Sequence, residues 1–286
     1  MQMSRWRRIL VFPITRIVLC ILGAALLGIV FDLVGVPVLH LLRVPEPAKP
    51  LESLAAILAL VLLVRFVERR SPKEAGLGTT GMVRDTAAGF LVGTLIISLT
   101  IGAMALAGLY RVQSVQLSWA AFGFGLWHYL WVGVFEEVLI RGVVFRILEE
   151  WLGSWIALGA SALLFGVLHL MNPNASLFAA LAIAAEAGIL LGAAYMLTRN
   201  LWLAIGIHWA WNFCEGPVFG TAVSGGPAWG GLLRPIVEGP VLWTGGGFGP
   251  EASLFALLIA TTAGVAMVAA AAGRGHVVSR KTQVPA

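Results

Sequence analysis

Long apolar stretches, separated by short polar or charged connections, run through the whole chain. Eight of them are about 20 residues long, which is the length a helix needs to cross the hydrocarbon core of a bilayer. Backbone groups in lipid must pair within their own segment, so such stretches form helices. The pattern therefore predicts an all-α, polytopic transmembrane helix bundle of about eight spans, at residues 14–39, 51–67, 86–109, 119–148, 153–171, 176–197, 201–219 and 252–272.

The composition agrees with a membrane protein. The 286 residues are 59% hydrophobic and only 12% charged, where a soluble domain carries roughly 25% charged residues. The 34 glycines and 11 tryptophans also fit, because small residues let membrane helices approach closely and Trp anchors helices at the interface. Cys20 and Cys214 lie inside apolar stretches, so we interpret them as packing residues rather than a disulfide framework.

The net charge of +5 reflects topology. With the N-terminus placed in the cytoplasm, fifteen of the 19 Lys and Arg residues fall on the cytoplasmic side, and the other four are Arg43, Lys49, Arg111 and Arg234. This positive-inside bias predicts a multi-pass cell-membrane protein with both termini in the cytoplasm. The Arg-rich start is interpreted as part of a retained first span, because no small-x-small cleavage site follows it. We expect the lipid bilayer as a partner and no nucleic acid.

Polar connections divide the chain into three predicted parts. Residues 1–85 hold two spans, a Pro-rich turn at Arg43–Pro50 and a charged cytoplasmic linker at Glu68–Gly78. Residues 86–219 hold five spans with short connections, as in a compact bundle. Residues 220–286 hold the rest of a Gly/Pro-rich loop, expected to lie outside or partly re-enter the membrane, then the last span and a short tail.

Charged residues gather within the apolar second half. Each is costly there, about 2.5–3.5 kcal/mol at mid-bilayer, so each needs a partner or a purpose. Glu137 and Arg141 are four positions apart, which predicts an ion pair on one helix face. Glu136 points about 100° away and is left for another neighbour, as suits a general base. The alternative is that both carboxylates lie at a solvated helix end with the charged residues that follow them.

A histidine on the next predicted span adds to this group. His169 is either a packing residue or a catalytic one. Counting 1.5 Å per residue from the turn at Leu152–Ser154, both Glu136 and His169 rise about 25 Å. An antiparallel hairpin would then bring the two side chains to the same level.

Two polar residues on the seventh predicted span share a helix face. His208 and Asn212 are four positions apart, and both can donate hydrogen bonds to a developing oxyanion. Counted from Arg199, they rise only about 13–20 Å, which is short of the level of Glu136 and His169. The mismatch shrinks if residues 148–155 form an interfacial segment.

A further carboxylate, Glu186, falls in the middle of the sixth predicted span. A lone intramembrane Glu usually faces a wet cavity or a partner. Its role is left open here.

Three of these groups, taken in order, form a pattern: E-E-x-x-x-R at residues 136–141, F-x-x-x-H at 165–169 and H-x-x-x-N at 208–212. Together, each on its own predicted span, they resemble the CPBP family, which comprises the CAAX prenyl endoproteases of the Ras-converting type and the bacteriocin-processing or Abi proteins. The resemblance runs from about Leu126 to Asn212. The later run TGGGFGPEAS, at residues 244–253, is similar to one bacterial branch.

The resemblance implies a hydrolase, an intramembrane endopeptidase that cleaves a membrane-associated peptide or protein. Carried onto this chain, it implies that Glu136 with His169 activates the attacking water and that His208 with Asn212 holds the oxyanion. The Glu137 and Arg141 pair would brace the site.

Members of this family are commonly labelled metalloproteases. Glu136, His169 and His208 are the residues that would hold Zn²⁺ with an open position for water. No H-E-x-x-H motif is present, and we favour a metal-free glutamate mechanism without excluding the metal. No other cofactor is expected.

Two other functions fit the same residues. A non-catalytic scaffold or immunity protein would use the fold without turnover. A proton-coupled transporter would use Glu136, Glu186 and the histidines as a relay.

Overall fold

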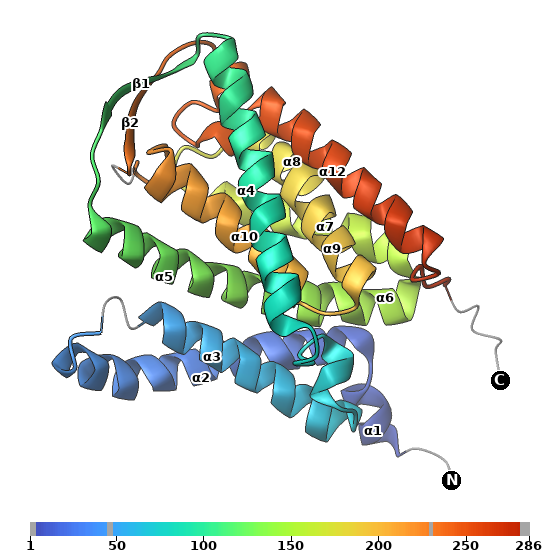
Figure 1. Cartoon of the computed structure of the whole chain (residues 1–286). Helices are drawn as coiled ribbons and strands as arrows, with labels where there is room; N and C mark the ends of the chain where they lie inside the picture. Colours follow the sequence, from blue (N-terminus) through green and yellow to red (C-terminus); the bar gives the residue numbers. More distant parts are fainter. Residues whose placement is uncertain (1–3, 45–47, 229–230, 281–286) are drawn as a thin grey trace.

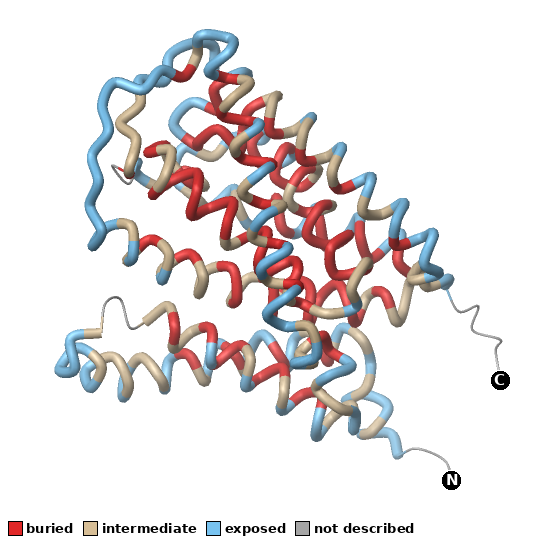
Figure 2. The backbone as a smooth tube through the Cα atoms, viewed as in Figure 1, coloured by how far each residue is buried: buried red, intermediate tan, exposed pale blue. Residues whose placement is uncertain are grey.

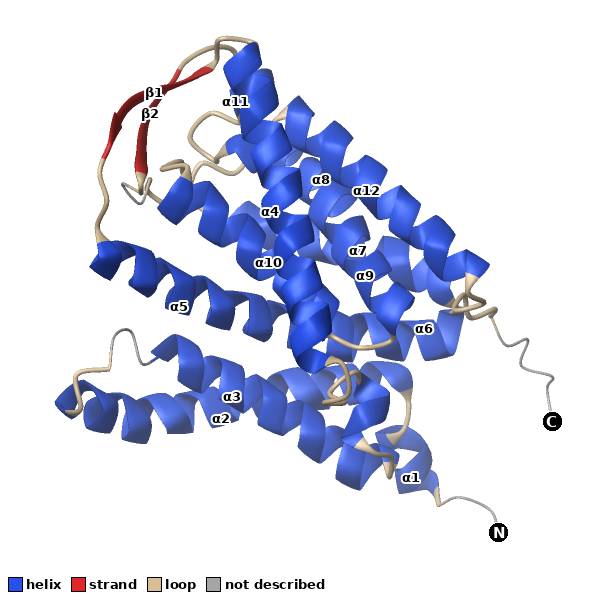
Figure 3. Cartoon of the chain, in the orientation of Figure 1, coloured by secondary structure: helices blue, strands red, loops and turns tan. Residues whose placement is uncertain are grey.

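The computed structural model describes residues 4–44, 48–228 and 231–280. Helices account for nearly all of the regular structure, and the π-helical and 3₁₀ turns, labelled η, mostly extend them (Figure 3). In chain order the elements are α1 Arg5–Leu10, α2 Pro13–Leu41, α3 Ala48–Leu62, η1 Leu63–Glu68, η2 Pro72–Ala75, α4 Met82–Leu106, β1 Tyr110–Val115, α5 Trp119–Glu137, η3 Val138–Phe145, α6 Arg146–Leu152, α7 Ser154–Leu168, η4 His169–Met171, α8 Leu177–Ile183, η5 Ala184–Gly188, α9 Ile189–Thr198, α10 Trp202–Phe213, η6 Cys214–Val218, β2 Leu233–Val237, α11 Val241–Thr244, η7 Pro250–Ala252 and α12 Leu254–Gly273.

Local sequence explains where several helices begin. Ser118, Ser176 and Ser253 each precede a helix, and each side chain accepts a hydrogen bond from a backbone N–H in the first turn. Such caps satisfy amide groups that have no partner within the helix. Pro13 stands at the first position of α2, where its missing N–H is not needed.

Six helices in the described part of the chain are long and apolar enough to cross a membrane: Pro13–Leu41, Ala48–Glu68, Met82–Leu106, Ser154–Met171, Leu177–Thr198 and Leu254–Gly273. They correspond to six of the eight predicted spans, and they make the chain a multi-pass helical membrane protein. The other two predicted spans are helical, but α5 with η3 and α6 is more polar, and α10 with η6 is shorter. The count of eight stays a prediction.

A small sheet departs from the predicted all-α fold. β1 and β2 pair antiparallel, with Tyr110 opposite Val237 and Val115 opposite Leu233 (Figure 3). In the segment YRVQSV only Tyr110 is buried, and the segment lies between spans, where water can satisfy the strand edges. A prediction that rests on the length of apolar stretches cannot detect so short a hairpin.

The Pro-rich turn is shorter than predicted. Residues 45–47 lie outside the described residues, and α3 already begins at Ala48 rather than after Pro50. The predicted linker after Glu68 lies against the bundle, because Trp202 Nε1 donates to the Gly78 carbonyl at 2.6 Å and Leu201 N donates to the Gly76 carbonyl at 3.1 Å.

Glycine allows α4 and α10 to cross in close contact (Figure 1). A Cβ on Gly89 would lie 2.2 Å from the Leu203 carbonyl oxygen, and one on Gly206 would lie 2.2 Å from the Thr86 carbonyl oxygen. Small residues at such crossings are what packs helices where no hydrophobic effect acts between them. This contact fixes the position of the helix that carries His208.

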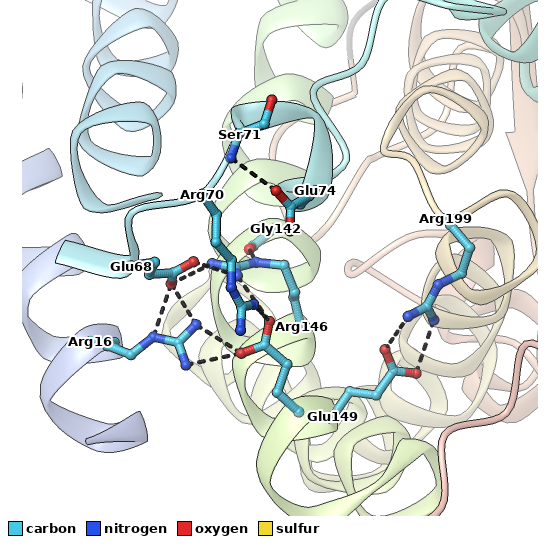
Figure 4. Close-up of polar contacts among 10 residues, drawn as sticks. Arg16, Glu68, Arg70, Ser71, Glu74, Gly142, Arg146, Glu149 and Arg199 are labelled. Atoms are coloured by element: carbon cyan, nitrogen blue, oxygen red, sulfur yellow. Dashed lines mark hydrogen bonds and ion pairs between the residues drawn. The ribbon is translucent and has the colours of Figure 1, made fainter. Parts of the chain in front are cut away.

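A partly buried charge network holds the α2–α3 hairpin to the bundle (Figure 4). Glu68, at the end of the second span, accepts hydrogen bonds from Arg16 at 2.5 Å and from Arg146 at 2.9 Å. Glu150 pairs with Arg16 at 3.0 Å and with Arg70 at 2.5 Å. Because several charges share partners, the network joins α2, η1 and α6 more firmly than one exposed pair would.

The two ends of the bundle differ. In Figure 1, α1 and the end of α12 lie on one side, and the β1–β2 hairpin lies on the opposite side. Buried residues concentrate in α9, α10 and their neighbours, while one side of α2 and α12 is largely exposed (Figure 2). The placement of both termini in the cytoplasm stays a prediction.

Candidate active site

The α5–η3 helix supplies a buried ion pair at its centre. Arg141 Nη1 lies 2.8 Å from Glu137 Oε1, and the two side chains are 1% and 0% exposed. The predicted pair is therefore confirmed, and the alternative of a solvated helix end is wrong for Glu137. The backbone between the two residues turns from α- to π-helical at Val138, a local change often found at functional sites.

Arg141 also ties this helix to two others. Its Nη2 donates to the carbonyl oxygens of Ala187 at 3.2 Å and Gly188 at 3.4 Å. The guanidinium lies over the Phe165 ring, 4.6 Å from its centroid, which is within the range of a cation–π contact. Phe165, the first residue of the F-x-x-x-H motif, therefore packs against the guanidinium of Arg141.

The His208 ring lies beside two carboxylates that are adjacent in the sequence, Glu136 and Glu137. Its Nδ1 lies 2.9 Å from Glu137 Oε1, and its Nε2 lies 3.8 Å from Glu136 Oε2. An ionised carboxylate only accepts, so Nδ1 carries a proton and Glu137 sets the orientation of the ring. The longer contact exceeds a hydrogen bond, so Glu136 Oε2 and His208 Nε2 face one another without bonding directly.

The predicted difference in depth between His208 and Glu136 is wrong. Both counts converted residues to depth at 1.5 Å each, which assumes that the helices run parallel. Residues 119–152 form one continuous helix through α5, η3 and α6, and in Figure 1 this helix runs at an angle to α10. Rises along the two helices therefore do not measure the same direction, and His208 Nε2 lies 3.8 Å from Glu136 Oε2.

A small cavity lies beside His208. It has about 20 Å³ of space for water, and His169, His208 and Asn212 all line it. A water molecule needs at least 10–15 Å³ measured in this way, so the cavity has room for about one. Three of the four residues expected to converge thus share one cavity, at 7% exposure for His208 and 6% for Asn212.

Two of these residues have polar atoms left for a ligand. His169 Nδ1 lies 2.8 Å from the Phe165 carbonyl oxygen, which can only accept, so this nitrogen donates and Nε2 of the neutral ring is an acceptor. No hydrogen bond holds the Asn212 amide within the described residues. Its N–H groups are therefore available to the cavity.

Glu136 is placed differently from the other three. It does not line this cavity, its side chain is 29% exposed, and its Oε2 is buried without a hydrogen-bond partner in the described part of the chain. Its contact with His208 connects Glu136 to the residues that line the cavity. Ser224 and Glu251, from the connection between α10 and α12, also form part of the cavity wall.

The residues do not fit a metal. Zn²⁺ requires three protein donors within about 2.0–2.3 Å of one point. The Nδ1 atoms of His208 and His169 are held by Glu137 and by a backbone carbonyl, which leaves only Nε2 of each ring as a candidate ligand. The third candidate, Glu136, lies outside the cavity that the two rings share. Among the described residues no group of three His, Cys, Asp or Glu side chains is placed to hold an ion. The metalloprotease label is not supported.

Sequence reasoning missed several residues around the cavity. Glu251 lines it, and Glu215 and Trp211 hold Glu251 through a hydrogen-bonded chain. Glu186, whose role the sequence left open, is not among the residues that line the cavity; it is fully buried, and neither of its carboxylate oxygens has a hydrogen-bond partner among the described residues. The sequence held one indication of Glu251: it lies in the run at residues 244–253, which resembles a bacterial branch of the family but was given no role in the reaction.

Fold and site together define a class: a polytopic helical membrane protein with a carboxylate–histidine–amide group buried among its helices. Residues 117–214 match the family model described as type II CAAX prenyl endopeptidase Rce1-like. The chain therefore carries a domain of this endopeptidase family, whose members are hydrolases, and the resemblance noted from the motifs is confirmed. No curated protein and no solved structure matches the chain.

Proposed function

We propose that this protein is an intramembrane endopeptidase that hydrolyses a peptide bond in a membrane-associated peptide or protein. The observation that carries the proposal is the placement of His208. It lies against Glu136 and Glu137 and borders a cavity of about one water that His169 and Asn212 also line. The family match of residues 117–214 supports the same class of reaction.

In the proposed reaction, Glu136 takes a proton from the attacking water. His169 helps to position that water, because its free Nε2 is an acceptor. Attack on the scissile carbonyl places a negative charge on its oxygen, which Asn212 and His208 stabilise by donating hydrogen bonds. No metal takes part in any step.

The charges around His208 are consistent with its donor role. Nε2 donates only when the ring carries two protons, since Nδ1 already donates to Glu137. With Glu136 and Glu137 ionised and Arg141 and His208 both positive, the four side chains sum to zero charge. Neutrality matters because uncompensated charge inside a membrane protein is costly.

The test uses the protein in proteoliposomes with a quenched fluorescent peptide that ends in a farnesylated CAAX sequence. An unprenylated peptide of the same sequence forms the second arm, and new N-termini in a reconstituted membrane-protein extract form the third. Glu136→Gln should lower the cleavage rate about 10²–10⁴-fold, as expected for loss of a general base. Asn212→Ala should lower it about 10²–10³-fold, as for an oxyanion donor.

Matched controls separate chemistry from folding. Glu238→Gln alters an exposed carboxylate whose pair with Arg111 is 65–68% exposed, and it should leave the rate unchanged. Cleavage in none of the three arms by well-folded wild type, or full activity in Glu136→Gln, would remove the proposal. Cleavage confined to one arm would define the substrate class.

A second candidate is a proton-coupled transporter, which the unpartnered and fully buried carboxylate of Glu186 favours. Its signature is proton flux across the liposome membrane, followed with an internal pH-sensitive dye. Flux that survives Glu136→Gln and is lost in Glu186→Gln would support transport instead of hydrolysis.

A further inference from the structure

The wall of the cavity contains one carboxylic acid among its described residues, and it is Glu251. This residue lies in η7, just before α12, and therefore beyond the segment of residues 117–214 that the family model covers. The other ionisable lining residues are His169 and His208. The connection between α10 and α12 thus places a carboxyl group in the wall of a cavity whose other lining residues, apart from Ser224, belong to the family domain.

A chain of hydrogen bonds ties Glu251 to the helix of the site. Its Oε1 accepts from the backbone N–H of Ser224, and its own N–H donates to Glu215 Oε1 at 3.1 Å. The other oxygen of Glu215 accepts from Trp211 Nε1 at 3.0 Å. Trp211 stands next to Asn212 in α10, so the position of Glu251 is set by the same helix that presents Asn212 and His208.

Glycines allow the loop to reach this position. Gly249 has φ +126°, and a Cβ there would lie 2.5 Å from the Ala222 carbonyl oxygen. Gly225 has φ +78°, and its Cβ would lie 1.8 Å from the Pro173 carbonyl oxygen. Both conformations and both distances exclude a side chain. The glycine-rich run at residues 244–253 therefore folds tightly enough to hold its own carboxyl, that of Glu251, in one place.

Glu251 is surrounded by groups that influence its proton. Buried Glu186 and Glu215 are its acidic neighbours, and His208 and Glu136 act on it from α10 and α5. Burial raises the pKa of Glu251 from 4.5 to about 7. A carboxyl that still holds its proton near neutral pH can act as a general acid.

Peptide hydrolysis needs such an acid. Breaking a C–N bond expels an amine nitrogen, which must gain a proton because an amide anion is too basic to leave. We propose that Glu251 donates this proton to the leaving nitrogen, and this inference rests on the proposed endopeptidase function.

The step balances in atoms and charge. Water adds its oxygen to the carbonyl carbon and gives one proton to Glu136. The oxyanion then reforms the carbonyl, the C–N bond breaks, and the nitrogen takes the Glu251 proton. The products are a carboxylic acid and an amine. One proton then returns from Glu136 to Glu251 through water, which restores both groups.

The test compares two bonds in the same farnesylated peptide. One probe contains the scissile amide, and the other replaces the amide nitrogen with sulfur, whose thiolate leaves without protonation since a thiol has a pKa near 8.5. Glu251→Gln keeps the size of the side chain and the oxygen that accepts from Ser224, and it removes the transferable proton. It should slow amide cleavage about 10²–10⁴-fold and leave thioester cleavage near the wild-type rate.

The outcomes separate this inference from the proposed function. Glu136→Gln should slow both probes, because both need the attacking water, and Glu238→Gln should slow neither. Active wild type, inactive Glu136→Gln and equal amide rates for Glu251→Gln and wild type would overturn the inference alone. Equal losses on both probes in Glu251→Gln would also overturn it, as they would reveal a structural role.

A measurement on wild type keeps the inference testable if Glu251→Gln does not fold. The ratio of amide to thioester rates should fall as the pH rises through about 7, since Glu251 then loses its proton. A ratio that stays constant from roughly pH 5.5 to 8.5 would contradict the proposal.

Discussion

Replacement of Arg141 by Met tests what the buried ion pair does for stability. Methionine has a similar length and fills much of the same space, so the principal change is the loss of the charge. Arg141 gives up one 2.8 Å contact with Glu137, two hydrogen bonds to backbone carbonyls and its position over the Phe165 ring. Glu137 stays fully buried, with His208 as its remaining partner.

The expected magnitude follows from that burial. Removing one member of a buried pair costs about 3–5 kcal/mol, because the other charge is left without compensation. At about 2–4 °C per kcal/mol, this lowers the melting temperature by roughly 10 °C. An exposed pair gives a matched control: the side chains of Arg111 and Glu238 are 65% and 68% exposed, so Arg111→Met should change the stability by less than about 1 kcal/mol.

The assay is thermal unfolding in detergent, followed by the intrinsic fluorescence of the tryptophans and by the yield of folded protein. The double variant Glu137→Gln/Arg141→Met removes both charges and should recover part of the loss, since the stranded carboxylate is then absent. If Arg141→Met melts like wild type, or if the double variant is less stable than the single one, the reasoning is refuted. Normal melting with lost activity would instead show that Arg141 binds substrate.

Three further predictions follow. Gly89→Ala should lower the free energy of unfolding by about 1–3 kcal/mol in the same melting assay, because its Cβ would lie 2.2 Å from a backbone oxygen of α10. Gly102→Ala in the same helix should be tolerated, because its Cβ would meet nothing within 4 Å. Equal effects of the two substitutions would contradict the close crossing of α4 and α10. The free energy of unfolding should decrease by up to about 3 kcal/mol as the pH rises from 4.5 to 7. Burial raises the pKa of Glu251 to about 7, so in this range the folded state keeps a proton that the unfolded chain loses. Glu251→Gln should lack this part of the pH dependence of stability, and an unchanged pH dependence would assign it to other groups. Reporter fusions at both termini should report the cytoplasm, and an external signal from either would overturn the topology drawn from the 15 to four distribution of basic residues.

Sequence spacing predicted those parts of the site that lie within one helix. The Glu137–Arg141 pair, and the shared face of His208 and Asn212, depend only on the 3.6-residue period of a helix, which holds whatever surrounds it. The depth count, by contrast, failed for His208, because it assumed parallel helices. The angle between the helix of residues 119–152 and α10 is set by tertiary packing and not by either sequence segment.

The sequence by itself determined that this chain forms membrane helices, since apolar length and missing charge leave no other way to pair the backbone in lipid. It also determined the order of the motifs that mark the endopeptidase domain. Only the tertiary structure decided that Glu137 binds Arg141 and His208 at once, that His169 shares a cavity with His208, and that Glu251 joins them. Apart from Glu137 with Arg141, these residues lie 39 to 82 positions apart in the chain, and Glu251 comes from a loop whose course depends on tight glycine turns. No local period encodes which helix faces will meet.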